Sequence, residues 1–364
     1  MRILHTEWSN GWGGQEIRII NEIVALKKQG HEIFLACRRD SKIAEVALKS
    51  QIPIFYLPFR GNVDLYSLFR LFLIVRRKNI DIVNTHSGKD TWVGGLAAKA
   101  AGVKFIRTRH LSNLISTSKL NFINEVADFV ITTGESVRSL MIKRNRIVPS
   151  KILSIPSGPD EKKFSPDKFS KNEAKKYFNL SKDEICIGML AVMRRFKRYD
   201  KFVNMADYIT TVFPDKNIKF CLAGDGPQRE LIKNLIKDKN LSKNFIFFGH
   251  IDNTPEYLRA LDLFVLCSDS GEGVPQSLMQ SLMMNTASIS TDVGSVRDLH
   301  FGNNFTLVDK DNQNELNHAV KKYIDNYDIA IGPETREFMV DNFSERVMIK
   351  KIQDLYKSLH ANFQ

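Results

Sequence analysis

The hydrophobic residues of this 364-residue chain fall into short runs separated by longer stretches in which apolar positions recur at helical spacing. Short continuous apolar runs are typical of strands buried on both faces, and the alternation with helical stretches predicts parallel sheets built of βαβ units. In the first half the runs occupy residues 2–6, 32–37, 53–57, 82–85, 105–109, 129–132 and 152–156. In the second half they occupy residues 185–190, 219–223, 245–248, 263–267, 287–290 and 305–308.

The pattern restarts after residues 157–176, a segment rich in proline, serine and charge that we interpret as an inter-domain linker. The chain is long enough for two α/β domains of ordinary size. We place a Rossmann-like domain in residues 1–165 and a second in residues 166–343, and we expect a helix within residues 344–364 to pack back on the first. Doubly wound sheets bind their ligands at the carboxyl ends of their strands.

Composition indicates a folded, water-soluble protein, with 43% hydrophobic and 26% charged residues. The beginning of the chain has no apolar region of the secretory type, and residues 65–75, interrupted by Arg70, are too short to span a bilayer. The cysteines lie in strand-like runs without the spacing of a metal knuckle or redox pair, so we expect buried, reduced thiols and a cytoplasmic protein. They are Cys37, Cys186, Cys221 and Cys267.

The formal charge of +12 belongs entirely to the first half of the chain. Residues 1–170 carry 27 Lys and Arg against 15 Asp and Glu, whereas residues 171–364 carry 26 of each. Such asymmetry predicts an anionic partner, either a phosphorylated substrate or an anionic membrane surface, and no motif favours nucleic acid. Arg70 and residues 76–78 adjoin an amphipathic run at residues 65–75; this basic helix either contacts a membrane or packs on its own sheet.

The segment SDSGEGVPQSLMQSLMMN, residues 268–285, contains a strand end, a glycine turn and a helix that starts after Pro275. The amides of Gln276 and Ser277 then lie in the first helical turn, where an anion such as phosphate binds favourably. Glu272 precedes them. A carboxylate there is either an ordinary exposed acid or a group that faces something other than phosphate, such as sugar hydroxyls.

Other polar segments also follow predicted strands. Cations at residues 193–198, MRRFKR, are suited to hold a diphosphate and to offset charge on a leaving group. The turn at residues 10–16, NGWGGQE, is rich in glycine but lacks the GxGxxG spacing of a dinucleotide site. Residues 223–227, AGDGP, fit a structural turn, and the backbone of residues 249–251 is placed to meet a base edge.

The motifs GGQE, RRFK, LAGDGP, FFGHI and EGVPQSLMQ occur in the order and spacing of the retaining glycosyltransferases of family 4 (group 1), which this chain resembles over essentially its whole length. The resemblance implies the GT-B fold, an α/β architecture of two Rossmann-like doubly wound domains facing a central cleft. It also implies a UDP- or GDP-linked sugar as donor, no metal ion and no further cofactor.

By the same resemblance Arg194 and Lys197 bind the diphosphate, Glu272 the hydroxyls of the donor sugar, and His86 lies near the reacting sugar. These four form the expected catalytic set. The expected donor-binding residues are Gly13, Gly14, Arg194, Lys197, Ile251, Glu272, Gly273, Gln276, Ser277 and Gln280. Glu16 and His110 are candidates on the acceptor side. Taken alone, either histidine is equally well explained as a buried structural residue.

Two positions depart from the family pattern. The usual Glu-x7-Glu is Glu272-x7-Gln280 here, so the group expected to meet the ribose is an amide that accepts hydrogen bonds without charge. Arg198 stands where a glycine commonly follows the lysine. The GVPQSLMQ segment resembles a subgroup associated with surface polysaccharide and lipopolysaccharide assembly.

The sequence, with what this resemblance implies, predicts a cytoplasmic, metal-independent, retaining glycosyltransferase of the hexosyl type, peripheral to the inner face of the cell membrane. Its partners would be a nucleotide sugar, a glycan or lipid-linked acceptor and an anionic membrane surface. Two alternatives remain: a GT-B nucleotide-sugar epimerase or hydrolase, and a catalytically degenerate anion-binding subunit.

Overall fold

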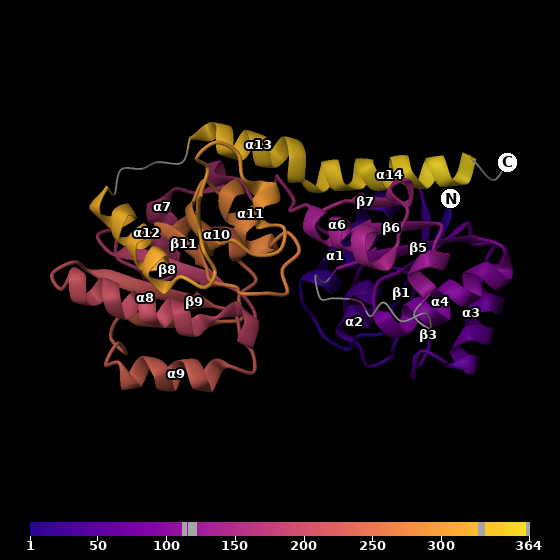
Figure 1. The fold of residues 1–364 in the computed structure, drawn as a ribbon, viewed down its shortest axis with the longest axis horizontal. Coiled ribbons are helices and arrows are strands. Elements are labelled where there is room, and N and C mark those ends of the chain that lie inside the picture. The colour runs from indigo at the N-terminus through magenta and orange to yellow at the C-terminus, as the bar shows by residue number, and fades with distance from the viewer. Residues whose placement is uncertain (111–114, 116–121, 327–331, 362–364) are drawn as a thin grey trace. The chain divides into compact units, whose positions relative to one another are not determined.

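The computed structural model describes residues 1–110, 115, 122–326 and 332–361 (Figure 1). The chain forms two compact units. Unit 1 comprises Met1–Ser157 together with Arg346–Gln364, and unit 2 comprises Gly158–Glu345. The change of unit thus comes at residue 157, before the boundary predicted at residue 165.

Unit 1 is built on a seven-stranded sheet in the order β3-β2-β1-β4-β5-β6-β7, with every neighbouring pair parallel. Its strands are β1 (Arg2–Glu7), β2 (Glu32–Cys37), β3 (Ile54–Tyr56), β4 (Ile82–Thr85), β5 (Lys104–Arg109), β6 (Phe129–Thr132) and β7 (Ile152–Ser154). Its helices are α1 (Gly14–Lys28), α2 (Lys42–Lys49), α3 (Leu65–Arg77), α4 (Gly88–Ala101), α5 (Ile123–Val126), α6 (Glu135–Asn145), η1 (Pro149–Lys151) and α14 (Glu345–Ala361).

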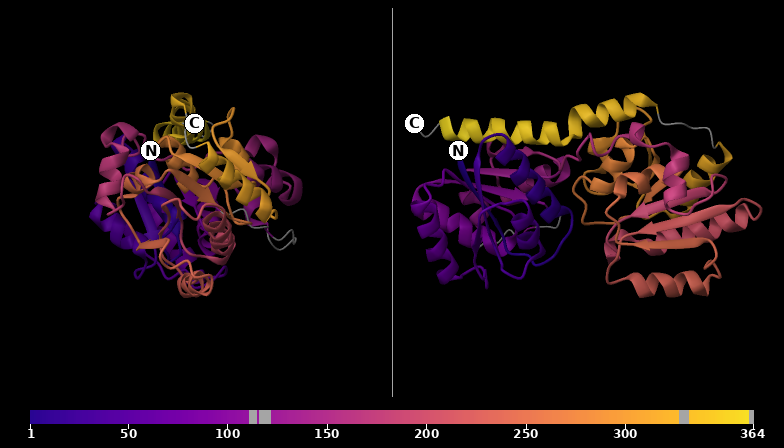
Figure 2. Two further views of the ribbon diagram at one scale, coloured as in Figure 1. Left: turned by 90° about the vertical axis from the view of Figure 1, so that its left-hand side faces the viewer. Right: turned by 180° about the vertical axis from the view of Figure 1, so that it is seen from behind.

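Successive residues of these strands feed two cores, because side chains along a strand alternate between the faces of a sheet. Ile3 joins the core under α1, α2 and α14, whereas Leu4 joins the core under α3, α4 and α6. Helix α14 contributes Ile352 and Tyr356 to the first core and lies along unit 1 in the right-hand view of Figure 2. The predicted end of this helix, residues 362–364, is outside the described residues.

Unit 2 contains a six-stranded parallel sheet in the order β10-β9-β8-β11-β12-β13. Its strands are β8 (Ile185–Leu190), β9 (Ile218–Ala223), β10 (Phe245–Gly249), β11 (Leu263–Leu266), β12 (Ala287–Thr291) and β13 (Thr306–Val308). Its helices are η2 (Pro166–Lys168), α7 (Lys171–Tyr177), η3 (Arg195–Lys197), α8 (Tyr199–Val212), α9 (Arg229–Asp238), α10 (Thr254–Ala260), α11 (Gln276–Met283), η4 (Val296–Leu299), α12 (Gln313–Asp325) and α13 (Pro333–Phe343).

Every apolar run predicted as a strand coincides with a strand of the structure, with ends that differ by at most about two residues. The α/β prediction is therefore confirmed. The segment interpreted as a linker, residues 157–176, instead contains η2 and most of α7 and is fixed to unit 2. Lys171 forms an ion pair with the buried Asp262 at 2.9 Å, and Arg336 donates to the backbone oxygen of Phe164 at 2.5 Å.

In both sheets, the chain adds strands first on one side of the first strand and then on its other side. In unit 1 the chain runs outward from β1 to β3 and then returns to place β4 on the other side of β1. In unit 2 it runs from β8 to β10 and returns to place β11 beside β8. The loops at the carboxyl ends of these strands diverge at such a switch point, which is where open α/β sheets bind ligands.

Helix α3 buries only part of the apolar stripe that the sequence predicts. The apolar run at residues 65–75 predicts a stripe of residues 65, 68, 69, 72 and 75. Of these, Val75 is buried in the core and Leu68 and Phe72 are partly buried against it, beside the buried Ser67 and Leu71. Leu65 is 71% exposed and Phe69 60%. The helix has two apolar faces, and only one of them packs into the core of unit 1.

The four cysteines are buried and unbridged, as predicted. No helix in the described part of the chain combines the length and apolarity needed to cross a bilayer.

Candidate active site

Lys197 and Glu272 meet at the switch point of unit 2. Lys197 ends η3, which follows β8, and Glu272 lies in the loop that follows β11. The lysine Nζ is 2.5 Å from the glutamate Oε1, and the Ser268 hydroxyl donates to the same oxygen at 2.5 Å. Their side chains are only 14% and 9% exposed. The fold thus joins two predicted site residues into one ion pair.

Close backbone packing fixes the loop that carries Glu272. Gly294 has φ of +60°, and a Cβ at this position would lie 2.1 Å from the backbone oxygen of Glu272. The neighbouring Ser295 amide donates to the backbone oxygen of Gly273 at 3.1 Å. On the other side, Gly271 lies against the ring of Phe196. The carboxylate is therefore presented from a closely packed loop.

The loop that carries Arg194 is supported by the turn at residues 223–227. The Met193 amide donates to the backbone oxygen of Asp225 at 2.9 Å, and a Cβ on Gly226 would lie 2.8 Å from the Met193 backbone. The glycine turn therefore has the structural role that the sequence predicted. Arg194 itself is exposed, and among the described residues its guanidinium forms no hydrogen bond or ion pair with Lys197 or Glu272.

Arg198, the departure from the family pattern, adopts the left-handed conformation that favours glycine, with φ of +49°. Its guanidinium donates to both carboxylate oxygens of Asp200, at 2.7 and 2.9 Å, and to Asp269 at 3.1 Å. The bonds to Asp200 and then Asp269 raise the pKa of Arg198 further above its ordinary value. Arg198 thus keeps the backbone conformation that glycine would have at this position. Because Asp269 belongs to the loop after β11, the arginine side chain also links that loop to the loop after β8.

The remaining predicted donor-binding residues of unit 2 lie at the same edge of the sheet, since all its strands are parallel. Helix α11 begins at Gln276 behind Pro275, and Ser277 and Gln280 are half-buried along it. Ile251 is half-buried just beyond β10. A helix start, an ion pair and exposed guanidinium groups at one sheet edge form an arrangement suited to a phosphorylated ligand.

In unit 1 the predicted glycine turn opens α1. Gly13 is the N-cap residue, Gly14 begins the helix, and the buried Glu16 carboxylate accepts a hydrogen bond from the Gly13 amide at 2.9 Å. This is the return half of a capping box. Glu16, predicted as an acceptor-side residue, thus uses one carboxylate oxygen to hold the turn.

Three histidines form a continuous buried chain beside this turn. Nδ1 of His5 lies 2.9 Å from Nε2 of His86, and Nδ1 of His86 lies 2.9 Å from Nε2 of His110. Burial, together with the neighbouring positive groups, lowers the pKa of His86 and of His110 well below the ordinary value. Neutral imidazoles can donate from one nitrogen and accept at the other, so the chain is hydrogen-bonded without charge. His86 is the middle member and is 1% exposed.

Glu7, which sequence reasoning missed, ends β1 at the unit 1 switch point. Its carboxylate accepts hydrogen bonds from the Ser9 amide at 2.8 Å, the Ser87 hydroxyl at 2.7 Å and the Gln15 amide at 2.5 Å. Burial and then the nearby Asp90 carboxylate raise the pKa of Glu7 to about 8. Its signal in the sequence is an acid at the end of a buried strand, directly before a glycine-rich turn.

Glu7→Gln should flatten the dependence of stability on pH. Between pH 4.5, the ordinary carboxyl value, and about pH 8, folded Glu7 retains a proton that the unfolded chain has lost, so the free energy of unfolding falls as pH rises. The glutamine variant does not titrate there. Between pH 4.5 and about pH 8, its free energy of unfolding should therefore rise by ~2–5 kcal/mol relative to that of wild type.

The measurement is the melting temperature of both proteins at pH 5, 7 and 9. Exposed Glu45 on α2 provides the control, since Glu45→Gln removes a carboxylate from the same unit without a buried titration. Parallel profiles for wild type and Glu7→Gln would show that Glu7 titrates normally.

Comparison with known proteins covers nearly the whole chain. Residues 12–163 match the family described as Glycosyltransferase Family 4, and residues 170–345 match the family described as Glycosyl transferases group 1. The chain is 25% identical to the UDP-Gal:alpha-D-GlcNAc-diphosphoundecaprenol alpha-1,3-galactosyltransferase of Escherichia coli, in an alignment that covers 100% of this chain and 98% of that protein.

Solved structures share the fold. A glycosyltransferase from Rickettsia africae superposes with a TM-score of 0.88 at 19% identity, covering 98% of each chain. HepE from Anabaena, in complex with UDP, superposes with a TM-score of 0.86 at 15% identity, covering 98% of this chain and all of the other. With both halves matched and the architecture shared from end to end, this chain belongs to the group 1 glycosyltransferases of family 4, which have the GT-B fold.

Proposed function

We propose that the protein is a retaining, metal-independent hexosyltransferase that moves a sugar from UDP to a hydroxyl of a lipid-linked saccharide during assembly of a cell-surface glycan. The observation that carries this proposal is the Lys197–Glu272 pair at the β8–β11 switch point, beside the start of α11. The proposal of UDP is supported by the UDP-Gal donor in the name of the E. coli relative and by the UDP complex of HepE. The E. coli name also supports the lipid-linked acceptor.

In this proposal the cations and helix amides take the place that a metal ion has in other transferases. Arg194, Lys197 and the first amides of α11 offset the charge that develops on the departing diphosphate. Lys197 has three donor hydrogens, so it can hold Glu272 with one and phosphate with another. Glu272 accepts hydrogen bonds from the sugar hydroxyls. No cofactor beyond the donor is needed.

The acceptor oxygen attacks C1 of the sugar on the face from which the diphosphate departs. The new C–O bond forms as the C1–O bond to phosphate breaks, and the acceptor proton passes to the departing phosphate oxygen. The anomeric configuration is therefore retained. The basic first half of the chain suits a phosphorylated acceptor at the cytoplasmic face of an anionic membrane.

This function is tested with the purified protein, a panel of UDP-, GDP- and ADP-sugars and a polyisoprenyl diphosphate-linked saccharide, with EDTA in every reaction. We expect transfer from a UDP-hexose, with NMR of the product showing the donor's anomeric configuration. Activity that requires added Mn²⁺ or Mg²⁺, or an inverted product, would contradict the proposed mechanism. Free sugar or an epimer formed without acceptor would identify the hydrolase or epimerase alternative.

Arg194→Ala and Lys197→Ala should each weaken UDP binding or turnover about tenfold or more. A hydrogen bond between charged groups typically contributes ~1.5–3 kcal/mol. Isothermal titration with UDP and steady-state kinetics provide the measurements. Lys233→Ala, which removes a cation from the exposed face of α9 in the same unit, is the control and should behave like wild type. Wild-type affinity and turnover in both loop variants would refute their role.

Substitutions at Glu272 and Gln280 should have unequal effects. Glu272→Gln removes the charge that faces the transferred sugar, so it should lower kcat more than it weakens binding of free UDP. Gln280 is proposed to meet the ribose, whose contacts are similar in ground and transition states, so Gln280→Ala should mainly raise KM for the donor. Gln280→Glu should remain active.

These variants are compared by steady-state kinetics, with UDP affinity and melting temperature measured separately. The melting temperature matters because Glu272→Gln also breaks the ion pair with Lys197. If Gln280→Ala abolished turnover while Glu272→Gln kept the wild-type rate, the two assignments would have to be exchanged.

A further inference from the structure

Unit 1 contains a basic hollow at the carboxyl ends of β2 and β3, with a volume of about 670 Å³. This volume is in the range of small-molecule sites. The charged groups that line it are Arg38, Arg39, Arg60, Lys89 and one acid, Asp40. The hollow therefore has a formal excess of three positive charges.

Asp40 lines the same hollow and Asp64 lies near Arg60, but these cations are not held in close ion pairs in the described part of the chain. Among the described residues, none of the four is within 4.0 Å of a carboxylate oxygen in an ion pair. Two rest on aromatic rings instead: the Arg39 guanidinium lies 4.7 Å from the ring centre of Tyr56, and the Lys89 ammonium lies 4.3 Å from that of Trp8. Aromatic contacts position a cation while leaving its charge available to an anion.

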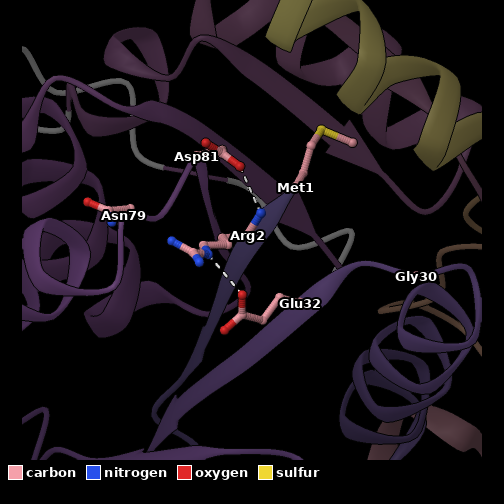
Figure 3. A pocket seen from close by; sticks show the side chains of 6 residues that line it. All are labelled: Met1, Arg2, Gly30, Glu32, Asn79 and Asp81. Carbon is pink, nitrogen blue, oxygen red and sulfur yellow. Dashed lines mark hydrogen bonds and ion pairs between the residues drawn. The ribbon is translucent and has the colours of Figure 1, made fainter.

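A second hollow in the described part of unit 1 provides a contrast. It has a volume of about 400 Å³ and includes Arg2, Glu32 and Asp81 at the opposite ends of the strands (Figure 3). There the Arg2 side chain pairs with Glu32 at 2.8 Å, and its backbone amide donates to Asp81 at 2.7 Å. The polar groups satisfy one another, so no charge is left over for a ligand.

The basic hollow adjoins the polar cluster of the unit 1 switch point. Lys89 lies in the first turn of α4, two residues after Ser87, whose hydroxyl donates to Glu7. Trp8, under the lysine, is the residue that follows Glu7. An anionic group held in the hollow would therefore place the rest of its molecule beside that cluster.

One wall of the hollow continues into the start of α3. The Phe59 amide donates to the Ser67 hydroxyl oxygen at 3.3 Å, and the Arg60 amide donates to the Asp64 carboxylate at 2.9 Å. Beyond this wall lies an apolar patch, which we define as Val63, Leu65, Tyr66 and Phe69, with exposures of 85%, 71%, 56% and 60%. Arg70, Arg76 and Arg77 are exposed on the same helix. Exposed apolar groups among cations are typical of a surface that meets anionic lipid.

We infer that the hollow binds the phosphate or diphosphate group of a lipid-linked acceptor, and that the apolar patch on α3 contacts the lipid of that acceptor at the membrane surface. This inference rests on the proposed function and adds to it the residues that select the acceptor. Arg39 and Arg60 bind the phosphate oxygens, since guanidinium groups match their geometry. Leu65 and Phe69 enter the interfacial region of the bilayer.

Binding to vesicles tests the phosphate part. The probes are phosphatidylcholine vesicles that carry a polyisoprenyl diphosphate, the same vesicles with the unphosphorylated polyisoprenol, and vesicles with phosphatidylglycerol at matched charge. Wild type should bind the diphosphate vesicles at least about tenfold more tightly than either of the others, given the strength of charged hydrogen bonds. Inorganic pyrophosphate in solution should compete.

The double variant Arg39→Ala/Arg60→Ala should lose this preference. The matched control is Lys143→Ala/Arg144→Ala, which removes the same charge from exposed positions of α6, between β6 and β7 at the far end of the sheet. The control should keep the preference. Equal losses in both double variants would mean that only net charge matters and would overturn the inference. So would equal wild-type binding to diphosphate and phosphatidylglycerol vesicles.

The variant Leu65→Ser/Phe69→Ser tests the lipid part. It should weaken binding to the diphosphate vesicles about tenfold or more while leaving the affinity for inorganic pyrophosphate unchanged. Wild-type vesicle binding in this variant would show that the hollow takes a water-soluble phosphate, and the lipid contact would be wrong. Circular dichroism confirms that each variant is folded.

UDP titration separates this inference from the proposed function. Arg39→Ala/Arg60→Ala should bind UDP as wild type does, because UDP is assigned to unit 2. A wild-type protein that binds no UDP and transfers no sugar would refute the proposed function. Normal transfer to the lipid-linked acceptor by Arg39→Ala/Arg60→Ala, with unchanged KM for that acceptor, would refute only the hollow's role.

Discussion

The pairing of two strands from different parts of the chain, β8 with β11, is the constraint on which the candidate site depends. Lys197 and Glu272 are 75 residues apart in sequence and meet only because these strands are neighbours with the same direction. The corresponding pairing of β1 with β4 brings Ser87 to Glu7. In each unit the strands are parallel and lie on both sides of the first strand. The polar loops that follow them therefore lie together at one edge of the sheet.

Burial affects which of the polar groups at these edges carry a charge. In unit 1 the cost of burying charge lowers the pKa of His86 and raises that of Glu7 to about 8, so neutral forms are favoured in both. Extensive hydrogen bonding offsets the remaining cost of burying polar atoms. In unit 2 Lys197 and Glu272 form an ion pair with each other. The two switch points therefore differ: one holds uncharged donors and acceptors, and the other holds an ion pair.

The cations discussed above differ in their partners. Those paired with carboxylates hold the structure together, whereas those without an acidic partner can attract an anionic ligand. Arg198 has two carboxylate partners and connects two loops. Lys197 has one carboxylate partner, and its ammonium group has further N–H donors that can bind a ligand. Arg39 and Lys89 rest on aromatic rings without an acidic partner among the described residues. Only the last kind leaves a site with a net positive potential, which an anionic ligand can use.

The sequence by itself determined the strands, the parallel α/β class and the segment around Glu272, because apolar runs and a proline-started helix depend on neighbouring residues in the chain. Tertiary structure decided what lies opposite each group. It paired Glu272 with Lys197, buried Glu7 among hydrogen-bond donors, and left one apolar face of α3 uncovered. It also let Arg198 occupy a glycine-type position, through carboxylates from α8 and from the β11 loop. Pairing, burial and exposure depend on residues that are distant in sequence. Periodicity and spacing along the chain therefore do not predict them.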